Sequence, residues 1–225
     1  MGWYKTATEA NVDEAAKSSG YNVGPVYHGS SSIDIKVFDI DKAGTIQTSD
    51  WGKGIYFTPS EFLANGYRDD AVEKTDQRSD ELFEEYEEAA RQLGTTPMMA
   101  GLDLGIDSEE YARLNEYFYK WQRYIQKLSK MKKGKTYGVY LSIHNPYYYV
   151  PQSITDPYLS DLALGRGHDS MLIVSEYGDL PEQAQEILVF KASQIKSADP
   201  VTYDDGGNVI PLCERFDQSS DDIRY

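Results

Sequence analysis

Two tyrosines, Tyr56 and Tyr67, stand eleven residues apart in a stretch whose residue types suit the binding of a flat ligand. Phenol rings stack on flat rings, so a pair of tyrosines facing one another can clasp such a ring between them. The chain contains 19 tyrosines, and most of them are therefore expected in the core. A core role stays open for this pair as well, and residues elsewhere in the chain must decide.

His28 is a second candidate, because it ends an apolar strand-like run and is followed by Gly29. A glycine in that place lets a ligand approach the backbone closely. A single histidine is more often a surface residue or a hydrogen-bonded core residue. Both interpretations of His28 stay open on the pattern alone.

Composition narrows the function classes. The net charge of −15 disfavours a phosphate-backbone partner, which needs clustered Lys and Arg. The three histidines and the single Cys213 do not have metal-ligand spacing, so no metal site is expected. One cysteine cannot form an internal disulfide. No apolar run approaches the roughly 18 residues of a membrane span, and no signal peptide opens the sequence, which predicts a cytoplasmic protein without a membrane partner.

The local sequence predicts a strand, a turn and a helix that position the two tyrosines. Ile55–Phe57 has the β-branched and aromatic residues of a short strand. Pro59 suits the first position of a helix, and Thr58 or Ser60 can cap its free N–H groups. This arrangement can aim Tyr56, from the strand, and Tyr67, from the helix, into one cleft.

Other elements follow from the same kinds of pattern. An exposed or irregular β segment is expected at 33–40, and a hairpin turn at Asp204–Gly207. The polar tail from Cys213 is expected to be flexible. Further strands are predicted at 26–29, 137–143, 170–174, 186–190 and 195–198, and short helices at 11–20 and 157–164.

Residues 70–134 differ in composition from the rest. Residues 79–93 carry apolar positions at helical spacing opposite an acidic face. A loop follows, and Asp107 with Glu110 resembles a capping box at the start of a long helix. The charged runs are interpreted as solvated helix faces. We therefore predict a single domain, 1–225, with a helical insertion at 70–134.

Three groups of residues now stand in a recognisable order: Tyr27-His28-Gly29-Ser30, then Gly54–Thr58 with Tyr67, then Glu186 at the start of an apolar strand. This order resembles the His-Tyr-Glu class of ADP-ribosyltransferases, which includes diphtheria toxin and the poly(ADP-ribose) polymerases. Asp50-Trp51 and Ala64–Tyr67 are similar to the corresponding segment of the toxin.

The wider chain is similar to the ADP-ribosyltransferase domains in polyvalent proteins of phages and mobile elements. The similarity covers 11–69 and 137–225 and leaves the helical insertion outside. It implies an α+β fold of split mixed or antiparallel sheets around an NAD⁺ cleft. It also allows delivery into a host cytoplasm. The matching segments are 12–17, 194–198, 208–216 and 222–225.

The resemblance implies NAD⁺ as substrate and gives each matching residue a role. Glu186, Tyr56 and His28 are the implied catalytic residues. Glu186 would bind the 2′-hydroxyl of the nicotinamide ribose and stabilise positive charge as the nicotinamide leaves. The implied NAD⁺-binding residues are His28, Gly29, Ser30, Tyr56, Thr58 and Tyr67.

The roles within that NAD⁺-binding set differ. His28 would bond a hydroxyl of the adenine-side ribose. The backbone of Gly29 would hold the nicotinamide amide. Tyr56 and Tyr67 would stack around the nicotinamide ring and orient it for departure.

Three functions remain open. The first is a mono-ADP-ribosyltransferase with a macromolecular acceptor, where protein is favoured over nucleic acid. The second is an NAD⁺ glycohydrolase, and the third is a degenerate NAD-binding or interaction module, against which intact His28, Tyr56 and Glu186 argue. Glu186 alone could also be the ordinary polar start of a strand. In arginine-modifying relatives a second glutamate stands two residues earlier, where this chain has Ala184, so arginine is disfavoured as acceptor.

Overall fold

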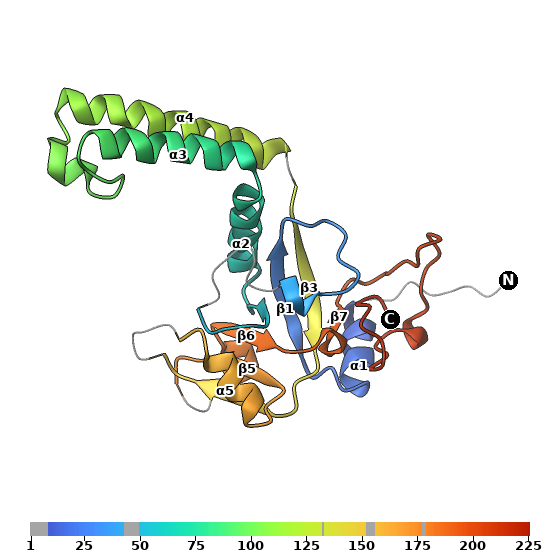
Figure 1. Ribbon diagram of the computed structural model, residues 1–225. Coiled ribbons are helices and arrows are strands. Elements are labelled where there is room, and N and C mark those ends of the chain that lie inside the picture. The colour runs from blue at the N-terminus through green and yellow to red at the C-terminus, as the bar shows by residue number, and fades with distance from the viewer. Residues whose placement is uncertain (1–8, 43–49, 132, 152–155, 177–178) are drawn as a thin grey trace. The chain divides into compact units, whose positions relative to one another are not determined.

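A computed structural model describes residues 9–42, 50–131, 133–151, 156–176 and 179–225 (Figure 1). The chain divides into two compact units. One comprises Met1–Arg68 with Lys135–Tyr225, and the other comprises Asp69–Gly134. The boundary falls inside one helix, α2 (Glu61–Lys74). That 70–134 is an insertion into a single domain stays a prediction.

The first sheet of the larger unit is antiparallel. His28 pairs with Tyr137 in it, and Gly29 pairs with Thr136. The valines of its first two strands are buried, as expected of β-branched residues on the inner face of a sheet. The strand order is β1 (Val23–Ser30), β3 (Lys135–Leu141), β7 (Ile195–Ser197).

The second sheet is mixed. In it β4 pairs with β5 in parallel, while β5 with β6 and β2 with β6 are antiparallel. The predicted α+β class with two small, mostly antiparallel sheets is therefore confirmed. The strand order is β2 (Ile55–Phe57), β6 (Glu186–Val189), β5 (Ser170–Ile173), β4 (Pro146–Tyr149). No strand was expected at β4, because the predicted strand at 137–143 is followed by Pro146; proline is tolerated as the first residue of an edge strand.

The two sheets meet where β1 passes the end of β2. Tyr27 N donates to Thr58 O at 2.8 Å, and Thr58 N donates to Tyr27 O at 3.0 Å. Beneath this bridge both sheets contribute to one apolar core, which includes Val26, Phe57 and Ile187. The shared core fixes β1, which carries His28, relative to β2 and β6, which carry Tyr56 and Glu186.

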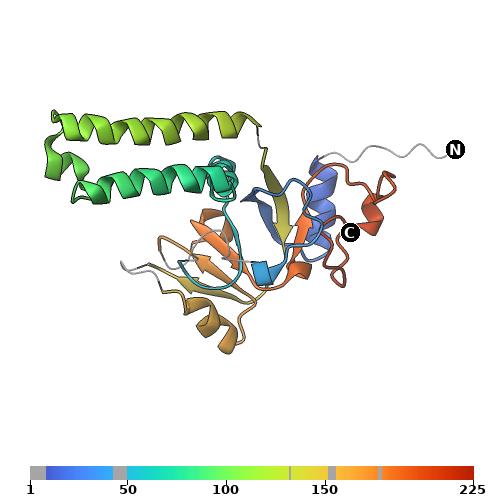
Figure 2. The same cartoon turned by 45° about the horizontal axis from the view of Figure 1, so that its top comes forward.

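Helices cover the outer faces of both sheets. The helix α5 (Leu159–Gly165) packs on β5, with Leu159 buried in a second cluster beside Trp51 and Met171. The helix α1 (Glu9–Ser18) lies beside the C-terminal tail in both views (Figures 1 and 2). Short 3-10 turns complete the unit: Ile40–Lys42, Pro181–Gln183, Ala192–Gln194 and Leu212–Glu214.

The expectation of a flexible tail after Cys213 is wrong. Phe216 is buried in the cluster that joins α1 to the first sheet, and Ile223 is buried in the core shared by the two sheets. The Lys196 ammonium donates to the carbonyls of Ser220 and Asp222 at 2.7 and 2.8 Å. The tail is polar in composition, but its few apolar side chains find partners far away in the sequence.

Three smaller expectations are corrected. Residues 33–40 form no strand; within them Val37 makes only an isolated β-bridge with Asp222. Pro59 does not begin a helix, because α2 starts at Glu61 and Ser60 Oγ accepts from Leu63 N at 3.3 Å. In the smaller unit Ser108, rather than Asp107, caps the long helix, since Ser108 Oγ accepts from Tyr111 N at 3.1 Å.

The smaller unit is a hairpin of α3 (Gln77–Gln92) and α4 (Glu109–Met131), connected through a π-helical turn at Gly101–Gly105. The helices lie side by side (Figure 1), with Tyr86, Ala90 and Leu114 buried between them. No helix in the described ranges has the length and apolar character that crossing a bilayer requires.

Candidate active site

Glu186 opens β6, and two donors from distant parts of the chain hold its carboxylate. Trp51 Nε1 donates to Oε2 at 2.7 Å, and the Tyr67 hydroxyl donates to Oε1 at 3.4 Å. The shorter bond has the length of a strong charge-assisted hydrogen bond. The carboxylate is partly exposed and, with both oxygens engaged, has a defined orientation.

Tyr56 shares a sheet face with Glu186. Tyr56 pairs with Leu188 across β2 and β6, and Glu186 lies two residues from Leu188 along its strand. Because side chains alternate along a strand, these three point to the same side. The Tyr56 hydroxyl donates to Gly52 O at 2.8 Å and accepts from Trp51 N at 3.3 Å. Its ring is thereby fixed next to the residue that holds Glu186.

The turn before β2 depends on Gly52. Its φ of +104° lies in a region that residues with a side chain rarely adopt. A Cβ atom there would also lie 2.2 Å from the buried hydroxyl oxygen of Ser160. Ser160 N donates to Trp51 O at 2.9 Å, so α5 and this turn are in direct contact. Close packing on α5 therefore sets the position of Trp51.

His28 is joined to Tyr56 through the backbone. Its Nδ1 lies 2.8 Å from Tyr56 O, and its ring packs against Phe38 and Phe57, with centroid distances of 5.1 and 5.6 Å. Burial lowers the pKa of the His28 imidazole below its ordinary value, while the Tyr56 carbonyl acts in the opposite direction. Since a carbonyl only accepts, Nδ1 carries the proton, and Nε2 of the neutral ring is an acceptor.

Gly29 is required by packing as well as by any ligand. A Cβ atom on Gly29 would lie 2.0 Å from Ala64 O and 2.4 Å from Arg68 N, both in α2. Only a glycine lets the helix that carries Tyr67 come so close to β1.

The orientation of the Gly29 backbone follows from the strand pairing. Tyr27 uses its N–H and C=O to bond Thr58, which lies away from β3. Backbone groups two residues apart in a strand point to the same edge, so those of Gly29 point there as well. No hydrogen-bond partner for them occurs in the described part of the chain. They form an open donor and acceptor pair near the N-terminal part of α2.

Two further predicted residues have structural roles here. Ser30 Oγ accepts from Ser32 N at 3.1 Å, which turns the chain after β1. Thr58 is buried; its Oγ1 accepts from Ser60 N at 3.2 Å, and its backbone makes the bridge to Tyr27. These contacts shape the turns on either side of the site. They leave the proposed contacts of both hydroxyls with NAD⁺ untested.

Sequence reasoning gave no role to Trp51. The resemblance included Asp50-Trp51, but the indole N–H finds its acceptor 135 residues later in the chain. The position of Trp51 directly before Gly52 was the available signal for a functional role. No neighbouring residue in the sequence identifies Glu186 as its partner.

The other two histidines make local hydrogen bonds: His144 with Ser142 Oγ, and His168 with Asn145 O. Within the described residues, no cluster of three His, Cys, Asp or Glu side chains could hold a metal.

Residues 22–203 match the family described as ADP-Ribosyltransferase in polyvalent proteins. The chain belongs to this family. The match of the ADP-ribosyltransferase domain includes His28, Tyr56, Tyr67 and Glu186, and it ends before the C-terminal tail. No curated protein and no solved structure matches the chain.

The arrangement gives this ADP-ribosyltransferase domain three chemical elements in one region. They are a carboxylate held by an indole and a phenol, a neutral imidazole with a free acceptor nitrogen, and an open backbone edge. The carboxylate belongs to Glu186 in β6, the imidazole belongs to His28 in β1, and the backbone edge is that of Gly29, also in β1. A carboxylate held in this way can stabilise positive charge that develops close to it in a transition state.

Proposed function

We propose that this domain cleaves the nicotinamide–ribose bond of NAD⁺ and transfers a single ADP-ribose to a macromolecular acceptor, of which protein is the favoured class. The observation that carries the proposal is the carboxylate of Glu186, fixed at 2.7 Å by Trp51 and bonded by Tyr67. A carboxylate that only began a strand would need neither partner.

The residues present suit NAD⁺ in their hydrogen-bonding groups. The Gly29 N–H and C=O match the carbonyl and amine of a carboxamide, because one group donates and the other accepts. The His28 Nε2 atom accepts, as a ribose hydroxyl requires. When bound, NAD⁺ supplies the leaving nicotinamide and the sugar that is transferred.

Glu186 is proposed as the catalytic residue. Its carboxylate accepts a hydrogen bond from a ribose hydroxyl and faces the positive charge that grows as the glycosidic bond breaks. Trp51 and Tyr67 keep its two oxygens in place before the reaction, so little reorganisation is needed.

Tyr56 and Tyr67 are proposed as the two faces of a ring clamp. Tyr56 is fixed through its hydroxyl, and Tyr67 is 40% exposed on α2. The fixed ring provides a rigid face, and the exposed one a face that a ligand can cover.

The acceptor is proposed to be a residue other than arginine. The position of the second glutamate of arginine-modifying relatives is Ala184, which is 6% exposed and packs in the core shared by the two sheets. A side chain there faces the interior, while Glu186 lies on the opposite sheet face. No second carboxylate stands next to Glu186 at that position to receive a guanidinium.

The test uses NAD⁺ labelled in the adenylate part, incubated with the full chain and a cell lysate. Label that joins protein in the presence of wild type, and is absent with Glu186→Gln, supports the transferase. Label released only as free ADP-ribose indicates that water is the acceptor and the domain is an NAD⁺ glycohydrolase. Intact NAD⁺ after long incubation overturns the proposal of an enzyme.

A further inference from the structure

The C-terminal tail is built into the structure beside Lys36 and Val37, which precede Phe38, a neighbour of the His28 ring. Ser197 N donates to Ile223 O at 2.7 Å, and Ile223 N donates to Lys36 O at 2.8 Å. Asp222 makes an antiparallel bridge with Val37. The tail thus lies between β7 and the segment that follows β1, and it ties that segment to the first sheet.

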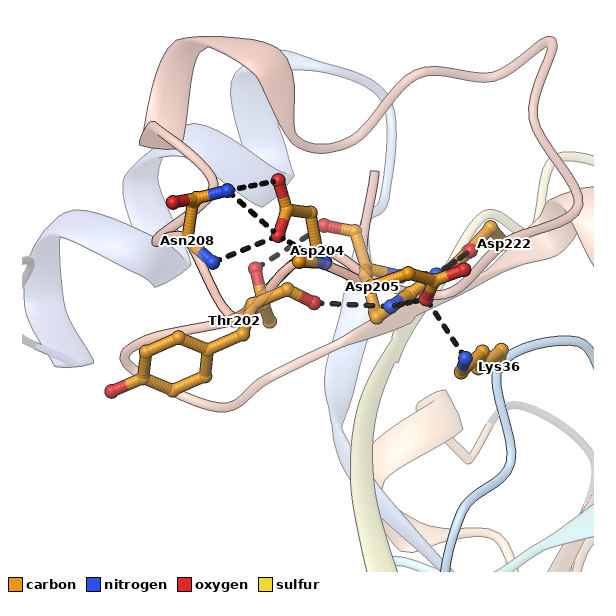
Figure 3. A network of polar contacts seen from close by, with 9 residues as sticks. Lys36, Thr202, Asp204, Asp205, Asn208 and Asp222 are labelled. Atoms are coloured by element: carbon orange, nitrogen blue, oxygen red, sulfur yellow. Dashed lines mark hydrogen bonds and ion pairs between the residues drawn. The ribbon is translucent and has the colours of Figure 1, made fainter.

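A network of charges closes over this junction (Figure 3). Arg224 Nη2 lies 2.7 Å from Asp222 Oδ2, and Arg224 Nη1 lies 2.8 Å from Asp205 Oδ1. Lys36 Nζ donates to the same Asp205 oxygen at 2.8 Å. Figure 3 shows Asp205, at the turn after β7, between Lys36 and the tail. The hydrogen bond from Lys36, together with Arg224, lowers the pKa of Asp205 to about 2.

Arg224 is the centre of this network. Its side chain is only 17% exposed, while those of Lys36 and Asp205 are 41% and 71% exposed. Its guanidinium also donates to Tyr203 O at 3.1 Å. A planar guanidinium with several bonds in one geometry positions its partners more precisely than a lysine could.

The segment held in this way delivers Phe38 to the site. Ile35 N donates to the Tyr137 hydroxyl at 2.8 Å, and Lys36 is held by the tail. Two residues later Phe38, which is 4% exposed, meets the His28 ring edge-on at 86°. Phe38 is the aromatic wall that excludes water from one side of the imidazole.

We propose that Arg224 is a positioning residue for the NAD⁺ site, acting through Asp205, Asp222 and Lys36 to hold Phe38 against His28. The ligand named here rests on the proposed function, but the effect on His28 does not. Without Arg224 the backbone bonds of segment 35–38 to the tail lose the charge network that braces them, so Phe38 packs less tightly against His28 and water reaches the imidazole. The tail is thereby part of the working site although it lies outside the family match.

The first test is an NMR titration of the histidines in the full chain, wild type against Arg224→Ala. The pKa of His28 is set by burial and by the Tyr56 carbonyl, with no charged side chain among its causes. In wild type it stays below the ordinary value, and in Arg224→Ala it rises toward that value. A folded Arg224→Ala protein whose His28 titrates as in wild type overturns the proposal.

Asp205→Asn is the second variant, because Asp205 is exposed at a turn and its loss cannot unfold the core. It removes the charge that Lys36 and Arg224 share, so it raises the pKa of His28 in the same direction, and Arg224→Lys gives an intermediate value. An Asp205→Asn protein with an unchanged His28 refutes the network even if Arg224→Ala fails to fold. Lys17→Ala, which breaks an exposed ion pair of α1 with Asp13, is the matched control and leaves His28 unchanged.

The second test is kinetic. Arg224→Ala raises the KM for NAD⁺ about threefold to tenfold, as expected of a residue that acts through others, and leaves kcat within about twofold. If Arg224 had a purely structural role, Arg224→Ala would lower the melting temperature and the active fraction of the protein without raising KM relative to kcat. If wild type does not cleave NAD⁺, the proposed function fails, and the His28 titration alone decides the role of Arg224.

Discussion

Glu186→Gln is the most informative single change in this domain. Glutamine has the size of glutamate and keeps one acceptor oxygen, which can still receive the Trp51 N–H that now lies at 2.7 Å. Its amide NH₂ then faces the Tyr67 hydroxyl, an oxygen that can accept as well as donate. The hydrogen bonds that orient position 186 therefore survive, and only the negative charge is lost.

The expected cost follows from that difference. Removing one preorganised electrostatic partner of a transition state lowers turnover by about 10²–10³, or roughly 2.7–4 kcal/mol. Binding of NAD⁺ should weaken by less than about tenfold, because the contacts proposed for His28, Gly29 and the two tyrosines with the ground state are kept. The fall therefore appears in kcat rather than in KM.

The assay measures both products, transferred and free ADP-ribose, over a range of NAD⁺ concentrations. Both should fall together, since both require the same bond to break. Glu176→Gln is the control, as Glu176 is an exposed carboxylate in the turn after β5. A Glu186→Gln protein with kcat within a few-fold of wild type would refute the assignment of Glu186 and reopen the non-enzymatic interpretation.

Four further predictions test the surroundings of Glu186. Trp51→Phe keeps the buried ring but removes the N–H donor, so kcat should fall about tenfold to a hundredfold. The control Trp121→Phe, in the helical hairpin, should leave kcat unchanged, and equal kcat values in the two variants contradict the role of Trp51. Tyr67→Ala should raise the KM for NAD⁺ by the roughly 0.5–1.5 kcal/mol of one stacking face, and unaltered NAD⁺ kinetics removes the clamp. The pKa of His28 is lowered in the folded state, so the unfolded chain binds a proton first as the pH falls below about 6.5. The free energy of unfolding should therefore drop more between pH 7 and 5 in wild type than in His28→Asn. Equal decreases of the free energy of unfolding in the two proteins refute this prediction. Replacing Asp70–Lys133 by a short Gly/Ser linker should leave a folded chain that binds NAD⁺. Thr136 Oγ1 lies 2.7 Å from Asn65 Oδ1, so the ends that the linker joins are close. An unfolded product would show that the hairpin is needed for folding.

Local sequence was sufficient for most of the elements that carry the site. The β-branched and aromatic run at 55–57, the stop at Pro59 and the apolar strand from Glu186 need only their neighbours to be recognised. Here periodicity and turn residues agree with the final fold. The predicted cap by Ser60 is confirmed, whereas errors of one or two residues at helix starts, as at Pro59 and Asp107, arise because several adjacent residues suit the same position.

Predictions failed where the partners are far apart in the sequence. The tail after Cys213 is polar, and composition alone predicts disorder for it. Its few apolar residues, Phe216 and Ile223, are buried by α1 and the two sheets, which no local window contains. β4 was missed although its tyrosines favour a strand, because Pro146 was expected to end the preceding strand and the pairing with β5 is a distant contact.

The sequence by itself determined the family of the chain and the candidate residues of its site, because residue type, strand context and order along the chain can be read without the fold. Only the tertiary structure decided how they are held. Trp51 reaches Glu186 across 135 residues, α2 approaches β1 over Gly29, and Ile223 of the tail bonds to Lys36, two residues before Phe38. Such contacts depend on how two elements pack, and packing is set by the whole core rather than by either segment.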